Sequence, residues 1–181
     1  MKNIYLIRHC TAAGQHPDSP LTRDGLRQAV QLKDFFISQN IDCDRIISSP
    51  YLRAIDSIRP YAEQIGLPID VDERLKERIL SDRPIDDWLD VLEQSFHDHH
   101  FRLPGGESAY DALTRAKDVF ASLDEHEDVM NVMIVSHGNL IALVLQQLDE
   151  AYGFDQWKQL RNPDIYKICY DENVVSVECI W

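Results

Sequence analysis

Ile4-Tyr5-Leu6-Ile7-Arg8-His9-Cys10-Thr11 joins four apolar residues directly to an arginine and a histidine. An apolar run of this kind predicts a strand that is buried in a parallel sheet. In open α/β sheets, ligands bind just beyond the carboxyl ends of the strands, and Arg8 and His9 stand at that position. Two polar side chains there are costly to bury without partners. A salt-bridged arginine and a packed histidine explain the stretch equally well, so by itself it leaves the function open.

The composition is that of a soluble globular protein. The chain has 181 residues, 44% of them hydrophobic and 27% charged, and this length fits one domain. The formal net charge is -13. Nucleic-acid binding requires a basic surface, so this charge argues against a nucleic-acid partner, and an acidic surface also repels anionic membranes. An anionic substrate therefore requires positive charge that is concentrated in one pocket.

The cysteines and the apolar runs lead us to expect a cytoplasmic protein. Cys10, Cys43, Cys169 and Cys179 form no CxxC pair and lack the spacing of zinc ligands, so reduced thiols are expected. We expect no signal peptide, because the N-terminus has no basic segment followed by an apolar core. No apolar run approaches the roughly 20 residues of a membrane span.

Strand and helix patterns alternate along the chain and predict an α/β fold, a three-layer α/β/α sandwich with a mainly parallel sheet and helices on both faces. After the opening strand, strands are expected at 44–47, 69–71, 132–135, 165–170 and 174–179. The last two form a hairpin around Asp171-Glu172-Asn173. Helices are expected at about 22–39, 51–64, 85–96, 108–125, 140–148 and 155–160. No repeat or low-complexity linker divides the chain, so a single domain over residues 1–181 is expected.

Capping residues mark the beginnings of three predicted helices. Thr22 is expected to cap the first helix, and Ser108 begins a capping box. Ser49 followed by Pro50 matches an N-cap and a first helical residue, which places Arg53 in the first turn. A cation in the first turn opposes the helix dipole, which favours an anion facing Arg53; a solvated arginine is the alternative.

The first predicted helix is expected to bury an apolar face. Residues three and four positions apart share one side of a helix and pack against the sheet. The apolar positions are Leu26, Ala29, Val30, Leu32, Phe35, Phe36 and Ile37.

Two charged segments are expected to be exposed. Most charges of residues 72–84 suit a solvated loop or helix surface. His97-Asp98-His99-His100 contains the residue types that bind metals, but adjacent residues rarely point at one ion. We therefore expect an exposed turn at this cluster rather than a metal site.

Polar residues follow three of the predicted strands: Arg8-His9, Ser48-Ser49 with Arg53 close by, and Ser136-His137-Gly138. The carboxyl ends of parallel strands share one sheet edge, so these groups are expected to converge. Guanidinium forks and helix N-termini both match phosphate oxygens. One neutral histidine can attack phosphorus, the second can hydrogen-bond the phosphoryl group, and a glutamate can protonate the leaving oxygen. Arginines at the same place repel cations, so no metal is expected.

Six motifs, in this order, resemble those of the histidine phosphatase superfamily, which includes cofactor-dependent phosphoglycerate mutases and many small phosphatases. The resemblance extends over nearly the whole chain. The motifs are Leu6-Ile7-Arg8-His9, Leu21-Thr22-Arg23-Asp24-Gly25, Ser48-Ser49-Pro50-Tyr51-Leu52-Arg53-Ala54, Leu75-Lys76-Glu77-Arg78, Pro104-Gly105-Gly106-Glu107-Ser108 and Val135-Ser136-His137-Gly138.

The resemblance implies a role for each matching residue. His9 matches the phosphate-accepting nucleophile, and Glu77 matches the acid and base. The phosphoryl group would be held by Arg8, Arg53 and His137.

Other positions belong to the substrate contacts or to the frame around them. Gly138 and Gln15 are expected to bind substrate, and Gln15 stands where many members have an asparagine. Glu107 and Ser108 match a helix start and are expected to be structural. Thr11 and Asn139 are polar neighbours outside this set.

The sequence departs from the family pattern at two places. Cys10 replaces the glycine that commonly follows the histidine, and a thiol there is a rival nucleophile. We favour His9, because a cysteine phosphatase needs a glycine-rich phosphate loop with an arginine and none follows Cys10. Residues 78–84 replace the glycine and tryptophan that usually follow the acid, which leaves room for a catalytically weak member that binds a phosphorylated ligand or a protein.

The sequence thus predicts a metal-independent phosphatase that hydrolyses phosphate monoesters of small molecules through a phosphohistidine, without a cofactor. A phosphoglycerate-mutase-type phosphotransferase is the alternative. The chain lacks the longer insertions of those mutases, which favours hydrolysis, because a mutase must exclude water from its phosphoenzyme. The segment from Arg78 to Pro104 is expected to cover the site, and the oligomeric state is left open.

Overall fold

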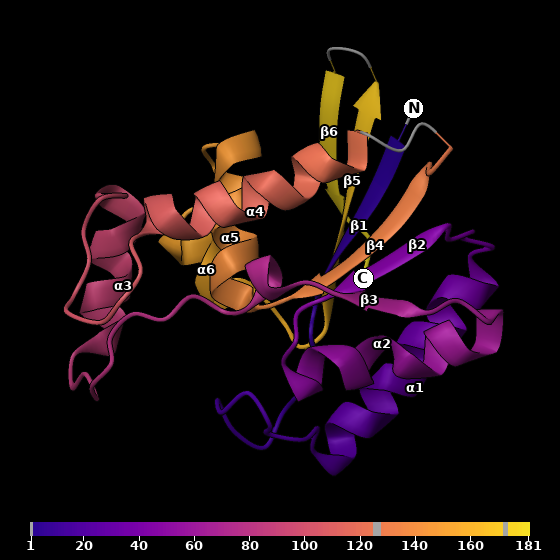
Figure 1. The fold of residues 1–181 in the computed structure, drawn as a ribbon, viewed down its shortest axis with the longest axis horizontal. Helices are drawn as coiled ribbons and strands as arrows, with labels where there is room; N and C mark the ends of the chain where they lie inside the picture. The colour runs from indigo at the N-terminus through magenta and orange to yellow at the C-terminus, as the bar shows by residue number, and fades with distance from the viewer. Residues whose placement is uncertain (1, 125–127, 172–173) are drawn as a thin grey trace.

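A computed structural model describes residues 2–124, 128–171 and 174–181. Its centre is a six-stranded sheet in the order β3-β2-β4-β1-β5-β6 (Figure 1). The strands are β1 (Lys2–Arg8), β2 (Arg45–Ser48), β3 (Ile69–Val71), β4 (Asn131–Ser136), β5 (Asp164–Asp171) and β6 (Val174–Cys179). The helices are α1 (Arg23–Ser38), α2 (Leu52–Ile65), α3 (Trp88–His97), α4 (Ala109–Asp124), α5 (Gly138–Leu148) and α6 (Phe154–Gln159), with a 3₁₀ turn η1 at Glu73–Leu75.

The sheet is mainly parallel, as predicted. Strand β4 pairs in parallel with both β1 and β2, and β2 pairs in parallel with β3. Strands β5 and β6 continue the sheet in the antiparallel direction. Their pairing confirms the predicted hairpin, although two residues of its turn, Glu172 and Asn173, lie outside the described residues. Arg8 is opposite Ser136, so the ends of β1 and β4 lie side by side.

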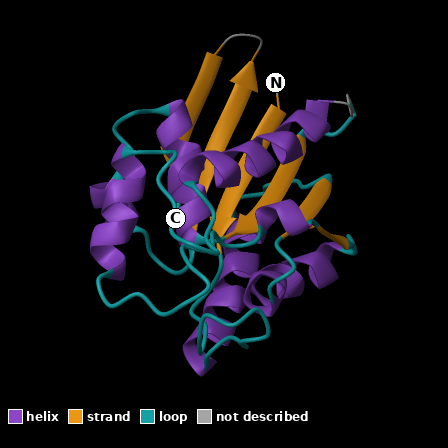
Figure 2. Cartoon of the chain, turned by 60° about the vertical axis from the view of Figure 1, so that its left-hand side comes forward, coloured by secondary structure: helices purple, strands orange, loops and turns teal. Residues whose placement is uncertain are grey.

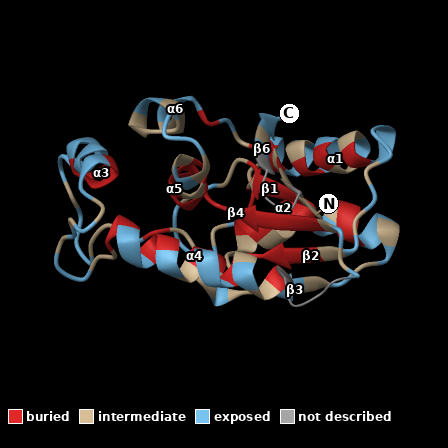
Figure 3. Cartoon of the chain, turned by 90° about the horizontal axis from the view of Figure 1, so that it is seen from above, coloured by how far each residue is buried: buried red, intermediate tan, exposed pale blue. Residues whose placement is uncertain are grey.

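Helices cover both faces of the sheet, as predicted (Figures 1 and 2). Side chains alternate along β1: Ile4 and Leu6 join the cluster under α4 and α5, whereas Tyr5 and Ile7 join the cluster under α1 and α2. The central strands are therefore apolar on both faces and buried between two layers of helices (Figure 3).

The buried face of α1 is narrower than predicted. Ala29, Leu32 and Phe36 are buried, whereas Leu26 and Val30 are 56% and 44% exposed. Ile37 and Phe35 belong to the predicted buried face as well. Ile37 is exposed, and Phe35 is partly buried against the hydrophobic cluster under α1 and α2. The seven apolar positions spread around more of the helix than one stripe can contact, so only the stripe facing the sheet is covered.

The expected N-cap of α2 is wrong by two residues. Ser49 and Pro50 precede the helix, which begins at Leu52 with Tyr51 as its N-cap. The Ser49 hydroxyl accepts a hydrogen bond from the backbone of Tyr51, and it also contacts His137, so it is used in the turn before the helix. Arg53 still lies in the first turn, as predicted.

The N-terminal caps of α1 and α4 agree with the prediction from the sequence. The Thr22 side chain accepts from the backbone of Gly25, which confirms it as the N-cap of α1. Ser108 and Asp111 exchange side chain–backbone hydrogen bonds, which confirms the capping box before α4. Its expected last residue, Glu125, lies outside the described residues. In the described ranges, the helices are too short or too polar to cross a membrane.

Candidate active site

The ends of β1 and β4 bring two histidines together. His9 follows β1, and His137 follows β4 as the N-cap of α5. Their ring centroids are 5.1 Å apart, with the planes at 60°. Arg53 reaches the same place from α2, because its Nε lies 3.3 Å from Nε2 of His9. Parallel pairing thus places three of the predicted site residues, from three parts of the chain, in one cluster.

His9 has an unprotonated Nε2. Its Nδ1 lies 2.6 Å from the carbonyl oxygen of Cys10, which can only accept, so the Nδ1–H group donates this hydrogen bond. Nε2 then accepts from the Nε–H of Arg53. Burial lowers the pKa of His9 to about 4, and the charges of Arg53 and Arg8 act in the same direction. The imidazole is therefore neutral near pH 7, with its lone pair on Nε2.

Arg53 is 1% exposed and links the histidine to the loop after β1. Its Nη1 donates to the carbonyl oxygens of Gln15 and His16, at 3.2 and 3.0 Å. Its Cζ lies 4.8 Å from the ring centroid of Tyr51. The same guanidinium group therefore contacts Nε2 of His9 and fixes the loop that carries Gln15.

Arg8 passes over the start of α5. Its Nη1 donates to the carbonyl oxygen of Leu160 at 2.6 Å. A Cβ atom at Gly138 would lie 2.9 Å from both Cζ and Nε of Arg8, closer than such atoms approach in proteins. Glycine at position 138 therefore provides the space for the guanidinium group.

His137 is fully buried and neutral. Its Nε2 lies 2.7 Å from the hydroxyl oxygen of Ser49. Burial lowers its pKa well below the ordinary value, and proximity to His9 and Arg53 lowers it further. The Ser49 hydroxyl already accepts from the backbone of Tyr51, so it can donate to Nε2 and leave the proton of His137 on Nδ1.

Three buried side-chain polar atoms in the described part of the chain have no hydrogen-bond partner: Nε of Arg8, Nδ1 of His137 and Oδ1 of Asn139. All three belong to this cluster or to its edge. An unsatisfied buried polar atom typically costs about 1–3 kcal/mol. Two of these atoms are potential donors, so the cluster is prepared to bind an anionic or strongly polar ligand.

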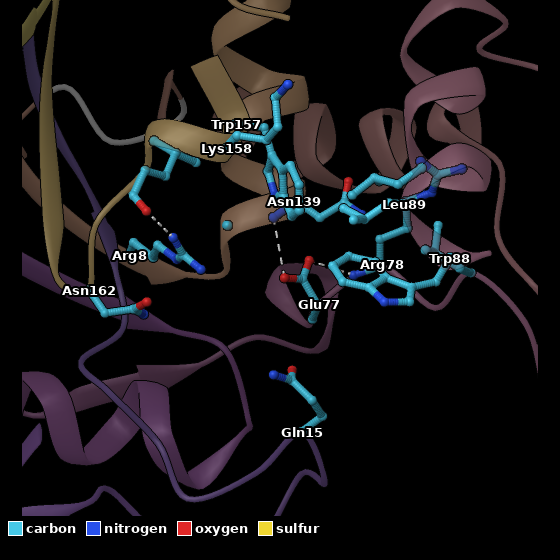
Figure 4. A pocket seen from close by; sticks show the side chains of 14 residues that line it. Arg8, Gln15, Glu77, Arg78, Trp88, Leu89, Asn139, Trp157, Lys158 and Asn162 are labelled. Atoms are coloured by element: carbon cyan, nitrogen blue, oxygen red, sulfur yellow. Dashed lines mark hydrogen bonds between the residues drawn. The ribbon is translucent and has the colours of Figure 1, made fainter. Parts of the chain in front are cut away.

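Glu77 lies at the N-terminus of α5 (Figure 4). Its Oε1 accepts from the backbone N–H groups of Arg78 and Leu140, and its Oε2 accepts from that of Asn139. Burial raises the pKa of Glu77, while these N–H groups and Arg8 act in the opposite direction. The helix terminus that we expected to receive a substrate anion thus binds a carboxyl group of the chain itself.

A partly buried network holds the segment that carries Glu77. Arg115 donates to the carbonyl oxygens of Arg74 and Lys76, at 2.6 and 2.8 Å, and forms a two-pronged ion pair with Glu107. Arg78 donates to the carbonyl oxygen of Glu107. The expectation of mostly solvated charge is therefore wrong for Arg78, which is 5% exposed, because its guanidinium joins the segment to the start of α4.

A pocket of about 740 Å³ opens beside the histidine cluster. Of the predicted site residues, Arg8, Gln15, Glu77 and Gly138 line it. His9, Arg53 and His137 are buried and do not line it. In Figure 4, Glu77 lies between Arg8 and Asn162 on one side and Trp88 and Leu89 on the other. Polar groups from the strand ends and apolar groups from the helices thus share one cavity.

Sequence reasoning missed several residues of the site. Asn162 donates from its side chain to the carbonyl oxygen of His9 at 2.7 Å, and Ser49 contacts His137. Trp88 and Trp157 line the pocket from two helices. The sequence pattern assigns Ser49 to a helix cap, and the other three residues lie in no local pattern that links them to the strand ends.

The neighbours of His9 have structural partners. Cys10 is fully buried, and burial raises its pKa to about 11, so its thiol stays protonated near pH 7. Its backbone N–H donates to the Ser57 hydroxyl. Thr11 bonds through its backbone to Gln28 and Thr22, which ties the loop to α1.

The segment His97-Asp98-His99-His100 is mostly exposed, as expected, with His99 only half-buried. Nε2 of His99 lies 3.1 Å from the side-chain oxygen of Gln146. Within the described ranges, no group of three or more His, Cys, Asp or Glu side chains is placed to hold a metal ion.

Comparison with known proteins identifies the family of the chain. A sequence model of branch 1 of the histidine phosphatase superfamily matches residues 4–180. The chain belongs to this superfamily. A probable phosphoglycerate mutase (GpmB) of Salmonella choleraesuis is 30% identical to this superfamily member over 195 residues, which cover 96% of the chain and 87% of the relative.

Solved structures share the fold. A mycobacterial glucosyl-3-phosphoglycerate phosphatase matches with a TM-score of 0.76 and 23% identity, over 99% of this chain and 97% of the other. The α-ribazole phosphatase of Shigella flexneri matches with a TM-score of 0.77 and 22% identity, over 98% and 95%. A phosphoserine phosphatase of Entamoeba histolytica matches with a TM-score of 0.74 and 20% identity, over 98% and 95%.

Proposed function

We propose that this histidine phosphatase superfamily member is a metal-independent phosphomonoesterase that works through a phosphohistidine on His9. The observation that carries the proposal is the unprotonated Nε2 of a neutral His9, which faces the guanidinium group of Arg53 at 3.3 Å. A lone pair beside a fixed positive charge suits attack on a phosphoryl group, whose oxygens are anionic.

In the first step, Nε2 of His9 attacks phosphorus and the bond from phosphorus to the leaving oxygen breaks. The electron pair of that bond goes to the leaving oxygen, which takes a proton from Glu77. The raised pKa of Glu77 favours its protonated form, as a general acid requires. The products of this step are the free alcohol, phosphohistidine and ionised Glu77.

In the second step, water attacks phosphorus and the bond from phosphorus to Nε2 breaks. Glu77 accepts a proton from the water, which restores both residues and releases inorganic phosphate. Negative charge on the phosphoryl oxygens is stabilised throughout by Arg8 and Arg53 and by a hydrogen bond from His137. The positive charge of the two arginines replaces a metal ion in this scheme.

The test compares His9→Ala with His97→Ala, an exposed histidine outside the cluster. We expect His9→Ala to lose release of phosphate from p-nitrophenyl phosphate by at least about a thousandfold, and His97→Ala and EDTA to have no effect. Rapid quenching of the wild-type protein should trap an acid-labile phosphoryl group on His9. Turnover by His9→Ala, or trapping on another residue, would rule out this mechanism.

A mutase function is the second candidate, because the relative at 30% identity is named a probable phosphoglycerate mutase. A mutase passes the phosphoryl group to a second hydroxyl group, whereas a phosphatase passes it to water. Phosphorus NMR with 3-phosphoglycerate distinguishes the two. We expect inorganic phosphate to form faster than 2-phosphoglycerate, and the reverse order would favour the mutase.

A further inference from the structure

Five apolar side chains form one wall of the pocket, and we refer to them as the tryptophan wall. They are Leu80, Trp88, Leu89, Leu92 and Trp157. Trp88 is 46% exposed and Leu89 is 44% exposed. Scattered apolar residues are normal on a protein surface, but these converge in the cavity that also holds Arg8 and Glu77. A concave apolar wall next to a few polar groups is typical of a small-molecule site.

Aromatic contacts behind the tryptophan wall hold it in place. The rings of Trp88 and Trp157 meet edge-on, with centroids 6.1 Å apart and planes at 84°. The rings of Trp157 and Phe154 stack with their centroids 5.5 Å apart, and Phe154 packs against the buried Phe96 of α3. These contacts hold Trp157 of α6 against α3. Trp88 is 46% exposed, so about half of its surface is open to the pocket and to solvent.

The cations near this wall are already engaged. Arg78 donates to the carbonyl oxygen of Glu107 and to the hydroxyl group of Ser95. Lys158, also in the lining, forms an ion pair with Asp155 at 2.7 Å and lies over the ring of Phe154. Both cations are therefore paired with groups of the chain itself.

Acidic residues flank the wall instead. Asp86 and Asp87 precede Trp88, and Asp90 follows it closely; all three are exposed. These carboxylates do not line the pocket, but their negative charge next to Trp88 in the sequence disfavours a second anionic group close to the wall. A small polyanion such as a phosphoglycerate would meet this repulsion and would leave the indole rings uncovered.

We propose that the tryptophan wall binds the alcohol part of the substrate, and that the substrate is a phosphate monoester of an uncharged alcohol with a flat apolar group. This rests on the proposed phosphatase function and adds the substrate class. The phosphoryl group binds at Arg8 and the histidine cluster, while the flat group packs on Trp88 beyond Glu77. Packing of the flat group on Trp88 then helps to position the leaving oxygen of the substrate next to Glu77.

The test uses two alkyl esters with similar leaving groups, 2-naphthylmethyl phosphate and n-propyl phosphate. We expect kcat/KM of the wild-type protein to be about a hundredfold higher for the naphthylmethyl ester. Trp88→Ala should lower this ratio about tenfold, because the naphthyl group loses more contact with the wall than the propyl group does. Trp181→Ala is the matched control, because the third tryptophan packs on Phe35 and does not line the pocket.

A ratio near one in the wild-type protein, or a preference for 3-phosphoglycerate, overturns the proposal. An equal loss with both esters in Trp88→Ala also overturns it, because it shows that the indole only ties α3 to α6.

If no ester is turned over, the phosphatase proposal fails and the wall is tested by itself. Calorimetry with 2-naphthylmethylphosphonate and n-propylphosphonate then measures binding without catalysis. Tighter binding of the naphthyl compound that is lost in Trp88→Ala supports the proposal that the wall binds the alcohol part of the substrate. Equal binding of the two compounds overturns that proposal.

Discussion

The Nε of Arg53 lies 3.3 Å from Nε2 of His9, so a permanent cation faces the ring nitrogen that carries the lone pair. Burial and this charge both disfavour protonation, and the pKa of His9 falls to about 4. The Nδ1 proton is meanwhile held by the carbonyl oxygen of Cys10. The pair therefore keeps the histidine unprotonated and places positive charge beside the nitrogen that, in our proposal, attacks the phosphoryl group.

The first prediction is that acid destabilises the protein through His9. The pKa of a histidine is about 6.5 in an unfolded chain, and that of folded His9 is about 4. Between these values the unfolded chain binds one proton more, so the free energy of unfolding decreases as the pH falls from about 6.5 to about 4. At about pH 4, protonation linked to His9 has lowered the free energy of unfolding by about 3 kcal/mol. Urea unfolding at several pH values measures it.

His9→Gln serves as the reference for this titration, because glutamine binds no proton. The free energy of unfolding of the wild-type protein should fall more steeply below pH 6.5 than that of the variant. His137 is buried and neutral as well and acts in the same direction, but it is present in both proteins. Parallel curves for the two proteins would show that His9 titrates normally in the folded state.

The second prediction concerns Glu77→Gln and the leaving group. A general acid matters most when the departing alkoxide is a strong base, so n-propyl phosphate should lose about a hundredfold to ten-thousandfold in the rate of the first step, the release of the alcohol. p-Nitrophenyl phosphate, with a much better leaving group, should lose less than about tenfold in the same step. Release of the alcohol in a single turnover, measured by rapid quenching of the purified variant with each ester, gives the two losses.

The unequal loss also separates chemistry from folding. Glu77 accepts three backbone hydrogen bonds, so a glutamine there disturbs the start of α5 as well. Structural damage lowers both rates by similar factors, whereas removal of a proton donor lowers mainly the rate with the poor leaving group. Glu73→Gln, at an exposed carboxylate of η1, is the matched control and should leave both rates unchanged.

The sequence predicts the fold and the histidine cluster well because both follow from local patterns. Apolar runs identify β1 and β4, and the edge shared by parallel strands then places His9 next to His137. Ser49 was misassigned because its hydroxyl group has two possible uses, and the contact with His137 depends on another strand.

The remaining site residues depend on tertiary contacts that carry no local signal. Glu77 lies in an irregular segment that is held by Arg115 of α4, and only the family resemblance selected it from its charged neighbours. Trp88 and Trp157 meet because α3 packs against α6, and neither helix contains a pattern that predicts the contact. Their role in the pocket is therefore visible only in the folded chain.

The third prediction is that Cys10 is inert. Its thiol is fully buried, and its pKa is raised to about 11 by burial, so it is neither accessible nor ionised near pH 7. N-ethylmaleimide at pH 7.5 should label the exposed Cys179 and leave Cys10 unmodified, as peptide mass spectrometry would show. Cys10→Ala should retain phosphate release within about threefold. A loss as large as that of His9→Ala would identify the cysteine as the nucleophile instead.

The fourth prediction is that Gly138→Ala displaces Arg8 and lowers kcat/KM by about a hundredfold, the typical effect of a misplacement of about 1 Å. The added Cβ would lie 2.9 Å from both Cζ and Nε of Arg8, so the guanidinium group must move. The matched control is Gly153→Ala, because a Cβ there meets the side chain of Gln156 at 3.7 Å, an ordinary contact. Steady-state release of phosphate from p-nitrophenyl phosphate and the midpoint of thermal unfolding should be measured for both variants. A displaced arginine predicts lost activity in Gly138→Ala with little change in the midpoint, whereas unchanged activity would show that this position of Arg8 is not required for turnover.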